Sequence, residues 1–341
     1  MNFQSPPSPG DSTGEPDTQV ASHGKSAHLI RNAVIVLLLT LASLEIMLRL
    51  LGLTTPVLYA RDEATGYRLK PNQDVTFLQN RIVINRYGMR DSRSLDARPP
   101  SSRRVIVLGD SVTWGGLQIT QDDLFTTLAE QKLSGIEVLN AGVNGYSINQ
   151  MVALYESHLS ELQPDYILVC AIQRDFERPP TARLTGDGIA FPEKNPSSAI
   201  AMGVAVLRQV LQDRYDWRWL RAPRSAIPVN AEDRPNEDIN LESLKRLSDS
   251  VPGVILVLLP TLLTVSDRDL KIVSDEHLKD AGIQAYDLRD LVPVSSEDFV
   301  DRVHLTEAGH RKIAQAIADV LQNVIDEESE ASKPSQALEG H

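Results

Sequence analysis

The sequence predicts an α/β fold with a mostly five-stranded parallel sheet. Short apolar runs of strand length alternate with stretches of helical pattern. The runs are almost continuously apolar, which is typical of strands buried on both faces, and the alternation is typical of a parallel sheet with helices on both sides. The expected strands are residues 105–108, 136–139, 166–170, 254–259 and 283–286, and the expected helices are 124–133, 150–162, 267–279 and 307–324, all within a domain at 101–325.

The composition is that of an ordinary globular protein and argues against binding to nucleic acid. Of the 341 residues, 42% are hydrophobic and 23% are charged, with 46 acidic against 34 basic residues and a formal net charge of -12. Such a chain repels phosphate backbones rather than neutralising them. The single cysteine, Cys170, lies in an apolar run and has no companion thiol, so we expect a buried thiol, no metal and no other cofactor.

The N-terminal part predicts a disordered segment followed by a membrane anchor. Residues 1–28 are rich in Ser, Pro, Gly and Asp, so they can bury too little apolar surface to offset chain entropy. Residues 29–53 are the expected transmembrane anchor, because 33–53 are apolar except for Glu45 and Arg49, which can pair on one helix face. A cleaved signal peptide or a buried core helix are the alternatives. Basic residues lie on both sides of the segment, so charge alone gives no orientation.

Three further segments flank or interrupt the α/β domain. Residues 55–100 are expected to form a small β-rich subdomain, because 66–91 alternate apolar and polar side chains around turn-forming residues. Residues 177–250 interrupt the strand–helix alternation and contain one plausible helix, 199–212, followed by an aromatic segment. This insertion is a candidate substrate lid, a membrane-resting element or a packing excursion. The acidic tail, 326–341, is expected to be disordered.

A serine follows the first expected strand, within the sequence Gly-Asp-Ser at residues 109–111. Ligands of open α/β sheets bind at the carboxyl ends of the strands, so Ser111 lies where a catalytic group would be placed. A serine hydroxyl needs a base within hydrogen-bond reach and a third group that holds this base in the right tautomer. Taken alone, the three residues are a weak signal, because a Gly-Asp-Ser sequence after a strand is often only a turn.

An aspartate and a histidine at a suitable spacing occur near the C-terminus. Asp301 precedes His304 by three residues, just before the last expected helix, with Thr306 as its N-cap. On a loop, this spacing lets the carboxylate reach one imidazole nitrogen and leaves the other free to accept the serine proton. A surface loop with an incidental histidine has the same spacing. His310 is a competing base, but it falls in the first turn of the helix, where capping or packing is the expected role.

Three motifs together resemble the SGNH hydrolase family, also called GDSL-like esterases. The motifs occur in the family's order, and the resemblance covers about residues 104–324. They are VLGDSVTWG at 107–115, NAGVNGYS at 140–147 and DRVHLTEAGH at 301–310.

The resemblance implies a fold and a set of roles. The implied fold is a flavodoxin-like three-layer α/β/α sandwich. Ser111 matches the family's nucleophile, His304 its general base, and Asp301 the residue that orients the base. The backbone amides of Ser111 and Gly145 match two donors of the family's oxyanion hole, although a tight turn alone would also explain Gly145.

One position departs from the family's pattern. The family's third motif ends in Asn-Asp, and this Asn side chain is the third oxyanion donor; here the two residues are Arg174 and Asp175. Losing one oxyanion donor typically slows turnover by about 100- to 1,000-fold. Arg174, Gln173 and Asn144 are the candidate replacements. Otherwise Arg174 binds an anionic group of the substrate or is an ion-paired surface residue.

The segment before the α/β domain extends the resemblance. GYRLKPN at 66–72, followed by INRYGMRD at 84–91, is similar to membrane-anchored bacterial SGNH proteins, whose catalytic domain lies outside the cytoplasmic membrane. This implies a single-pass membrane protein that hydrolyses or transfers acyl esters, such as O-acyl groups of a cell-surface polysaccharide or glycolipid. The alternative is a non-catalytic, membrane-tethered protein for carbohydrate binding or assembly that keeps the fold.

Overall fold

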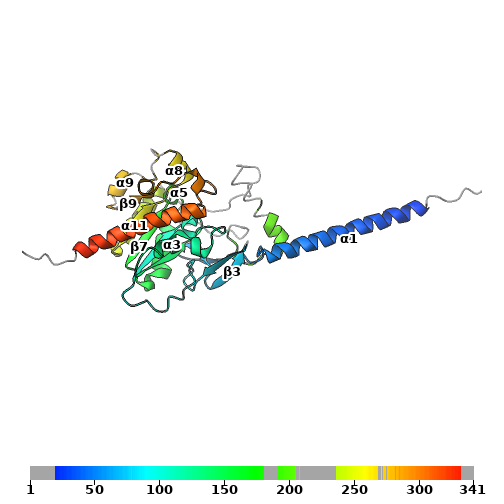
Figure 1. Cartoon of the computed structure of the whole chain (residues 1–341), viewed down its shortest axis with the longest axis horizontal. Helices are drawn as coiled ribbons and strands as arrows, with labels where there is room; N and C mark the ends of the chain where they lie inside the picture. Colours follow the sequence, from blue (N-terminus) through cyan, green and yellow to red (C-terminus); the bar gives the residue numbers. More distant parts are fainter. Residues whose placement is uncertain are drawn as a thin grey trace, which may run out of the picture. The chain divides into compact units, whose positions relative to one another are not determined.

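The computed structural model describes residues 20–77, 79–179, 191–204, 207, 236–267, 270, 272–273, 275–280, 282–283 and 285–331. The chain divides into two compact units, Met1–Met47 and Leu48–His341. All nine strands of the described residues belong to the second unit (Figure 1).

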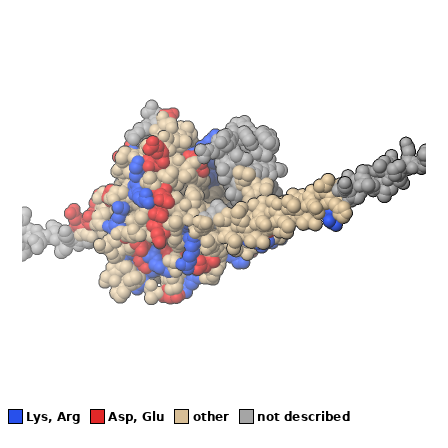
Figure 2. Space-filling model, turned by 45° about the vertical axis from the view of Figure 1, so that its right-hand side comes forward, with Lys and Arg blue, Asp and Glu red and all other residues tan. Residues whose placement is uncertain are grey.

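Helix α1 (Val20–Leu50) contains the expected anchor. Its segment His28–Leu50 is long and apolar enough to cross a membrane, with a mean hydropathy of 2.2, although a signal sequence would satisfy the same criteria. Figure 2 shows an almost uncharged surface along this segment. The helix begins at Val20, so residues 20–28 are helical rather than disordered as expected; extending an existing helix costs less than starting one. Residues 1–19 lie outside the described residues.

The segment 55–100 forms two antiparallel hairpins, as its alternating pattern predicts. Strand β1 (Tyr59–Asp62) pairs with β2 (Gly66–Leu69), and β3 (Gln73–Phe77) pairs with β4 (Asn80–Ile84). Together with the sandwich that follows, these hairpins lie in one compact unit.

The main sheet has five parallel strands, which confirms the predicted fold class. They are β5 (Arg103–Gly109), β6 (Ile136–Gly142), β7 (Tyr166–Ala171), β8 (Val254–Leu258) and β9 (Ala285–Asp287). Their order in the sheet is β6-β5-β7-β8-β9, so the first strand lies between the second and the third. This is the flavodoxin-like order, and its topological switch point falls between β5 and β7.

Helices cover both faces of the sheet. The longest are α7 (Asn236–Ser250) and α11 (Glu307–Ala331). The shorter ones are α2 (Ser111–Trp114), α3 (Phe125–Glu130), α4 (Ile148–Leu154), α5 (Gln173–Glu177), α8 (Leu262–Ser266), α9 (Asp275–Asp280) and α10 (Leu288–Leu291). Single 3-10 turns lie at Gln121–Asp123, Ser160–Leu162 and Ser296–Asp298, and a π-helical turn at Tyr155–Leu159.

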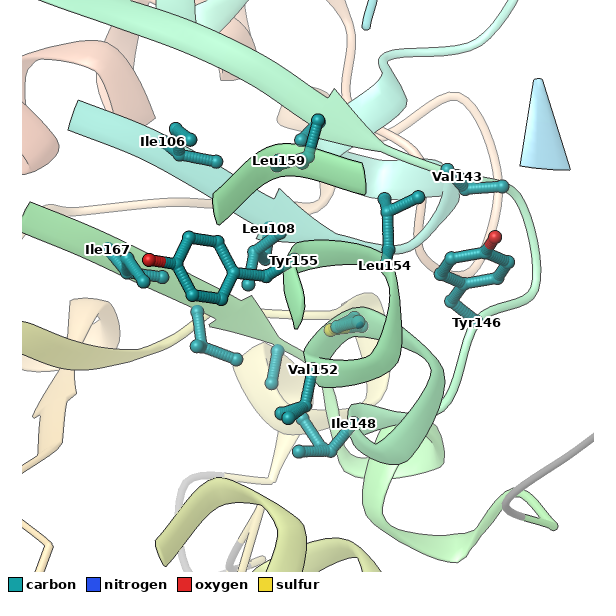
Figure 3. Packing of buried hydrophobic residues seen from close by; sticks show 14 of the residues in the cluster. Ile106, Leu108, Val143, Tyr146, Ile148, Val152, Leu154, Tyr155, Leu159 and Ile167 are labelled. Atoms are coloured by element: carbon teal, nitrogen blue, oxygen red, sulfur yellow. The ribbon is translucent and has the colours of Figure 1, made fainter. Parts of the chain in front are cut away.

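Strand β5 shows how the two halves of the core are divided. Its residues Ile106 and Leu108 pack with the side chains of α4 and α7, whereas Val105 and Val107 pack with those of α3 and α11. Figure 3 shows the first of these layers, with side chains of β5, β7 and α4 turned toward one another. Figure 1 shows α3 and α11 side by side over the other face. Successive residues of a strand point to opposite faces, which is why the expected strands read as continuous apolar runs.

Helix α7 corrects the expected limits of the insertion. Residues 236–250 were assigned to the insertion at 177–250, but they form a framework helix whose Leu241, Leu244 and Leu247 are buried in the core. The described part of the insertion includes a helical segment at 199–204 and 207; the remainder of the expected helix 199–212 and the aromatic segment lie outside the described residues.

Two further expectations about helices were wrong in their limits. Among the described residues of the expected helix 267–279, only those from Asp275, where α9 begins, are helical; the preceding helix, α8, is capped by Thr261 and ends before Asp267. Helix α11 continues to Ala331, although residues from 326 onward were expected to be disordered. Glu328 accepts a hydrogen bond from the hydroxyl of Tyr166, which ties this end of the helix to the sheet. Residues 332–341 lie outside the described residues.

Candidate active site

Ser111 lies at the carboxyl end of β5, next to the switch point of the sheet. It is the first residue of α2, and Asp110 is the N-cap, whose Oδ1 accepts the N–H of Val112 at 2.8 Å. The turn requires glycine at 109, because a Cβ there would lie 2.0 Å from Oγ1 of Thr113 and 2.9 Å from the carbonyl oxygen of Cys170. The serine is therefore presented on a tightly packed strand-to-helix turn.

The structure brings Ser111, His304 and Asp301 together. Nε2 of His304 lies 2.9 Å from Oγ of Ser111, and Nδ1 lies 2.7 Å from Oδ2 of Asp301. A proton on Nδ1, shared with the carboxylate, leaves Nε2 as the acceptor for the serine proton. The serine and the histidine are 193 positions apart in the chain, so this arrangement depends on the whole sandwich.

Asp301 is held by its own loop as well as by the imidazole. Its Oδ1 accepts the backbone N–H groups of Val303 at 2.9 Å and His304 at 2.8 Å. Partial burial alone would raise the pKa of Asp301, but the hydrogen bonds and the charge of His304 outweigh burial and lower this pKa to about 2. The carboxylate therefore stays ionised over any pH at which an imidazole base works.

His310, the competing base, lies in the core. Its side chain is 1% exposed, and its Nδ1 accepts the backbone N–H of Phe125 at 3.1 Å, at the start of α3. Burial, reinforced by the charge of Arg90, lowers the pKa of His310 to about 3. The histidine is thus a neutral cap for α3 that also stacks on Phe125, and the expected capping or packing role is confirmed.

Gly145 lies in the loop that follows β6, with a positive φ of 76°. A Cβ at this position would lie 3.0 Å from the hydroxyl of Tyr67 and 3.4 Å from the ring of Phe191. The Tyr67 hydroxyl donates to the carbonyl oxygen of Asn144 at 2.7 Å, and the buried hydroxyl of Tyr146 donates to the carbonyl oxygen of Tyr67. Side chains of the β-rich segment therefore fix the loop that carries Gly145.

Arg174 and Asp175 face different surroundings. Both lie on α5, directly after β7, but Arg174 is exposed whereas Asp175 is fully buried. Burial raises the pKa of Asp175 well above its usual range, and the nearby carboxylate of Asp110 raises it further. The role of Arg174 as an oxyanion donor stays a prediction.

Arg178 lies outside the motifs described above. It is placed between two buried aspartates, Asp110 and Asp175. Its Nη1 donates to Oδ1 of Asp175 at 2.5 Å, to Oδ2 of Asp110 at 3.1 Å and to the carbonyl oxygen of Tyr146 at 2.7 Å. Burial alone would lower the pKa of Arg178, but the charges of Asp175 and Asp110 outweigh burial and raise it. One guanidinium thus joins the Gly145 loop, α5 and the residue before Ser111.

The described residues contain no group of three or more His, Cys, Asp or Glu side chains that could hold a metal ion. Cys170 is buried in β7, and burial raises the pKa of its thiol.

Comparisons with known proteins find related solved structures. No protein-family model matches the sequence, and no curated protein matches it. A lipase/acylhydrolase from Enterococcus faecalis is 14% identical, with a TM-score of 0.39 over 65% of this chain and 96% of that chain. A member of the lipolytic G-D-S-L family from Veillonella parvula is 15% identical, with a TM-score of 0.38 over 65% and 99% of the two chains. A two-domain esterase active on acetylated mannans is 14% identical, with a TM-score of 0.38 over 65% and 50%.

Proposed function

We propose that the chain is a serine hydrolase that hydrolyses or transfers acyl esters. The observation that carries this proposal is the pair of hydrogen bonds in which Nδ1 of His304 donates to Asp301 and the hydroxyl of Ser111 donates to Nε2 of His304, at 2.7 and 2.9 Å. The same three residues match the nucleophile, base and orienting group of the SGNH motifs. Unrelated folds that share this geometry also use it for acyl transfer.

In the proposed reaction, Nε2 of His304 accepts the hydroxyl proton of Ser111 while the serine oxygen attacks the acyl carbonyl. The tetrahedral intermediate collapses, and the alcohol leaves with the proton from His304. Water or a sugar hydroxyl then attacks the acyl-enzyme, giving its proton to His304, and the serine is regenerated. Asp301 keeps the imidazole in the required tautomer and stabilises its charged form.

We assign the negative oxygen of the intermediate to the backbone amides of Ser111 and Gly145. Ser111 begins α2, so its N–H has no intrahelical acceptor. The loop of Gly145 is held by Tyr67, which gives the rigidity that an oxyanion donor requires. Arg174, exposed on the neighbouring helix, is the third candidate donor or a contact for an anionic substituent.

Reaction with a fluorophosphonate tests the nucleophile. We expect one equivalent of the reagent to attach to Ser111, and we expect no reaction in Ser111→Ala. His304→Ala, which keeps the serine but removes its base, should react at least about 100-fold more slowly. A wild-type protein that does not react would favour the alternative, a carbohydrate-binding or assembly protein that keeps the fold.

We also propose that α1 anchors the protein in the cytoplasmic membrane with the catalytic unit outside, where O-acyl groups of a polysaccharide or glycolipid are candidate substrates. The support is the apolar span His28–Leu50 and the resemblance of the segment after it to membrane-anchored SGNH proteins. The full chain should stay with membranes in alkaline carbonate, and protease added to spheroplasts should digest the catalytic unit. Release by carbonate or protection from protease would contradict the anchor or its orientation.

A further inference from the structure

The end of the candidate span, from Leu48 onward, belongs to the same compact unit as the α/β domain. The last turn of α1 packs against the described part of the insertion, because a Cβ on Gly203 would lie 3.5 Å from Leu48 and 3.3 Å from Leu53. Nη2 of Arg49 donates to the carbonyl oxygen of Ser197 at 2.8 Å. These contacts belong to a small apolar cluster that contains Leu48, Leu51, Leu53, Phe77, Leu117, Ala199 and Met202.

The described helical residues 199–204 and 207 have a second, outward side. Ala199 and Met202 are 0% and 6% exposed, whereas Val204 and Leu207 are 62% and 57% exposed. Leu50, the last residue of α1, is 83% exposed. Single exposed apolar side chains need no explanation, but these lie on the two segments that meet at the end of the span. A helix with one buried and one apolar exposed side suits the boundary between headgroups and acyl chains.

The same segment leads to the candidate oxyanion loop. The ring of Phe191 lies 4.9 Å from the ring of Tyr67, next to Gly145, and Ser197 follows only six residues later, at most about 20 Å of extended chain. On the other side, Leu117 follows the helix of Ser111 and packs into the cluster of Leu53. The segment that contacts Tyr67 beside Gly145 and the segment that follows Ser111 therefore both continue into the apolar cluster at the end of the span.

We propose that Leu50, Val204 and Leu207 form a membrane-docking surface of the catalytic unit that contacts the bilayer and holds the active site close to it. The occupant is the lipid bilayer itself, because Leu50 is the last residue of the candidate span and the segment that carries Val204 packs, at Gly203, against Leu48 in the last turn of that span. This inference rests on the proposed anchor. It assigns to the site acyl esters that are presented at the bilayer surface, such as those of a lipid-linked saccharide, rather than esters free in solution.

Depth-dependent fluorescence quenching tests the surface in the full-length protein. Single cysteines are introduced as V204C and L207C and labelled with an NBD fluorophore, and the protein is reconstituted into phosphatidylethanolamine/phosphatidylglycerol vesicles with brominated acyl chains. The native Cys170 is buried, so the parent chain gives the background of labelling. L39C, in the middle of the span, and D249C, on the exposed side of α7, are the inner and outer references.

We expect the brominated chains to quench the labels at 204 and 207 by about half, the label at 39 more strongly, and the label at 249 not at all. Each variant should retain reaction with fluorophosphonate, which shows that its site is folded. Labels at 204 and 207 that behave like the label at 249, with position 39 quenched, would overturn the docking surface and leave the anchor standing. An unquenched label at 39 would overturn the anchor and the docking surface with it.

Discussion

On the base side of the candidate site, Asp301 and His304 are three residues apart and hold each other through side-chain and backbone hydrogen bonds within one loop. On the oxyanion side, the contacts join distant segments. Tyr67 of β2 supports the loop of Gly145, and Arg178, which directly follows α5, links that loop to Asp110 and Asp175. The first arrangement depends on local spacing, the second on buried charges brought together by the fold.

The two sides of the candidate site differ in how deeply their side chains are buried. The side chains of His304 and Asp301 are about one-third exposed, at 29% and 31%, so their loss removes a reaction step and little packing. Asp175 is 0% exposed and Asp110 1%, so removing their shared cation leaves two buried carboxyl groups with backbone N–H donors, from Ile172 and Val112, but without that cation. We therefore expect base-side substitutions to stop turnover in a folded protein, and oxyanion-side substitutions to lower turnover and stability together.

The largest expected effect is on the base side. Ser111→Ala and His304→Ala should each lower kcat on a small acetyl ester by about 10⁴-fold or more, because the three residues act as a unit. Asp301→Asn should be about 10- to 100-fold milder. Circular dichroism and thermal unfolding should show the fold unchanged in all three. Wild-type turnover in Ser111→Ala would mean that another residue is the nucleophile.

Arg178→Met should lower both turnover and stability. Loss of the cation between Asp110 and Asp175 should cost about 3 kcal/mol of unfolding free energy and about 100-fold in kcat, because Asp110 precedes the nucleophile. Urea unfolding and ester kinetics measure the two effects. Arg178→Lys is the matched control: it keeps the charge but not the fork of donors, and should recover part of the stability. A stable, fully active Arg178→Met would remove the contrast between the two sides.

Arg174→Ala should have a smaller effect that depends on the substrate. If the exposed guanidinium binds an anionic substituent such as a uronate carboxylate, its loss should raise KM for a negatively charged acetyl ester about 10-fold. KM for a neutral ester should stay unchanged. A fall in kcat of about 100-fold on both esters would instead identify an oxyanion donor. Arg174→Asn, which restores the family's residue, should then recover activity. Unchanged kinetics on both esters would identify a surface ion pair.

The smallest effect on turnover is expected from His310→Gln, which should keep kcat within a few-fold because His304 is the base. Its effect on stability should depend on pH. The unfolded chain binds a proton at His310 as the pH falls below about 6.5, whereas burial delays protonation of the native residue to about pH 3. The free energy of unfolding of the wild-type protein therefore falls as the pH falls through this window. The variant lacks this titration, so between pH 7 and 5 its free energy of unfolding should fall by up to about 2 kcal/mol less than that of the wild type. Urea unfolding at the two pH values checks this, and an equal loss in both proteins would contradict it.

The sequence predicted the parts of the molecule whose signals are local. The apolar runs placed all five strands of the sheet, and the Asp-x-x-His spacing placed Asp301 beside His304. The GDS motif after the first strand identified the position of Ser111. These signals are readable because each depends on periodicity or spacing over a few residues.

The parts that were missed depend on partners far away in the chain. Most residues of helix α7 are polar or charged, and only Leu241, Leu244 and Leu247 form an apolar stripe. The sequence pattern therefore did not indicate a helix that packs in the core. Nothing in the sequence around Arg178 distinguished it from the other arginines of the insertion. Its spacing of three residues from Asp175 was nevertheless a usable signal for an ion pair. The contact of Tyr67 with the Gly145 loop has no local signal, because 77 positions separate it from Asn144.

Arg90, which lies in the β-rich segment and is 2% exposed, bears on how the catalytic unit unfolds. Its guanidinium donates to the carbonyl oxygens of Trp114, Gly116 and Ile119, which follow Ser111 in the chain. If the hairpins detached while the sandwich stayed folded, three carbonyl groups, two of them in buried hydrogen bonds, would lose their donor and a cation would lose its acceptors. Partial opening at the boundary near residue 100 is therefore as costly as opening the site itself. The hairpins and the sandwich should melt in a single cooperative transition, and the nucleophile should lose its geometry in the same step as the first strands leave.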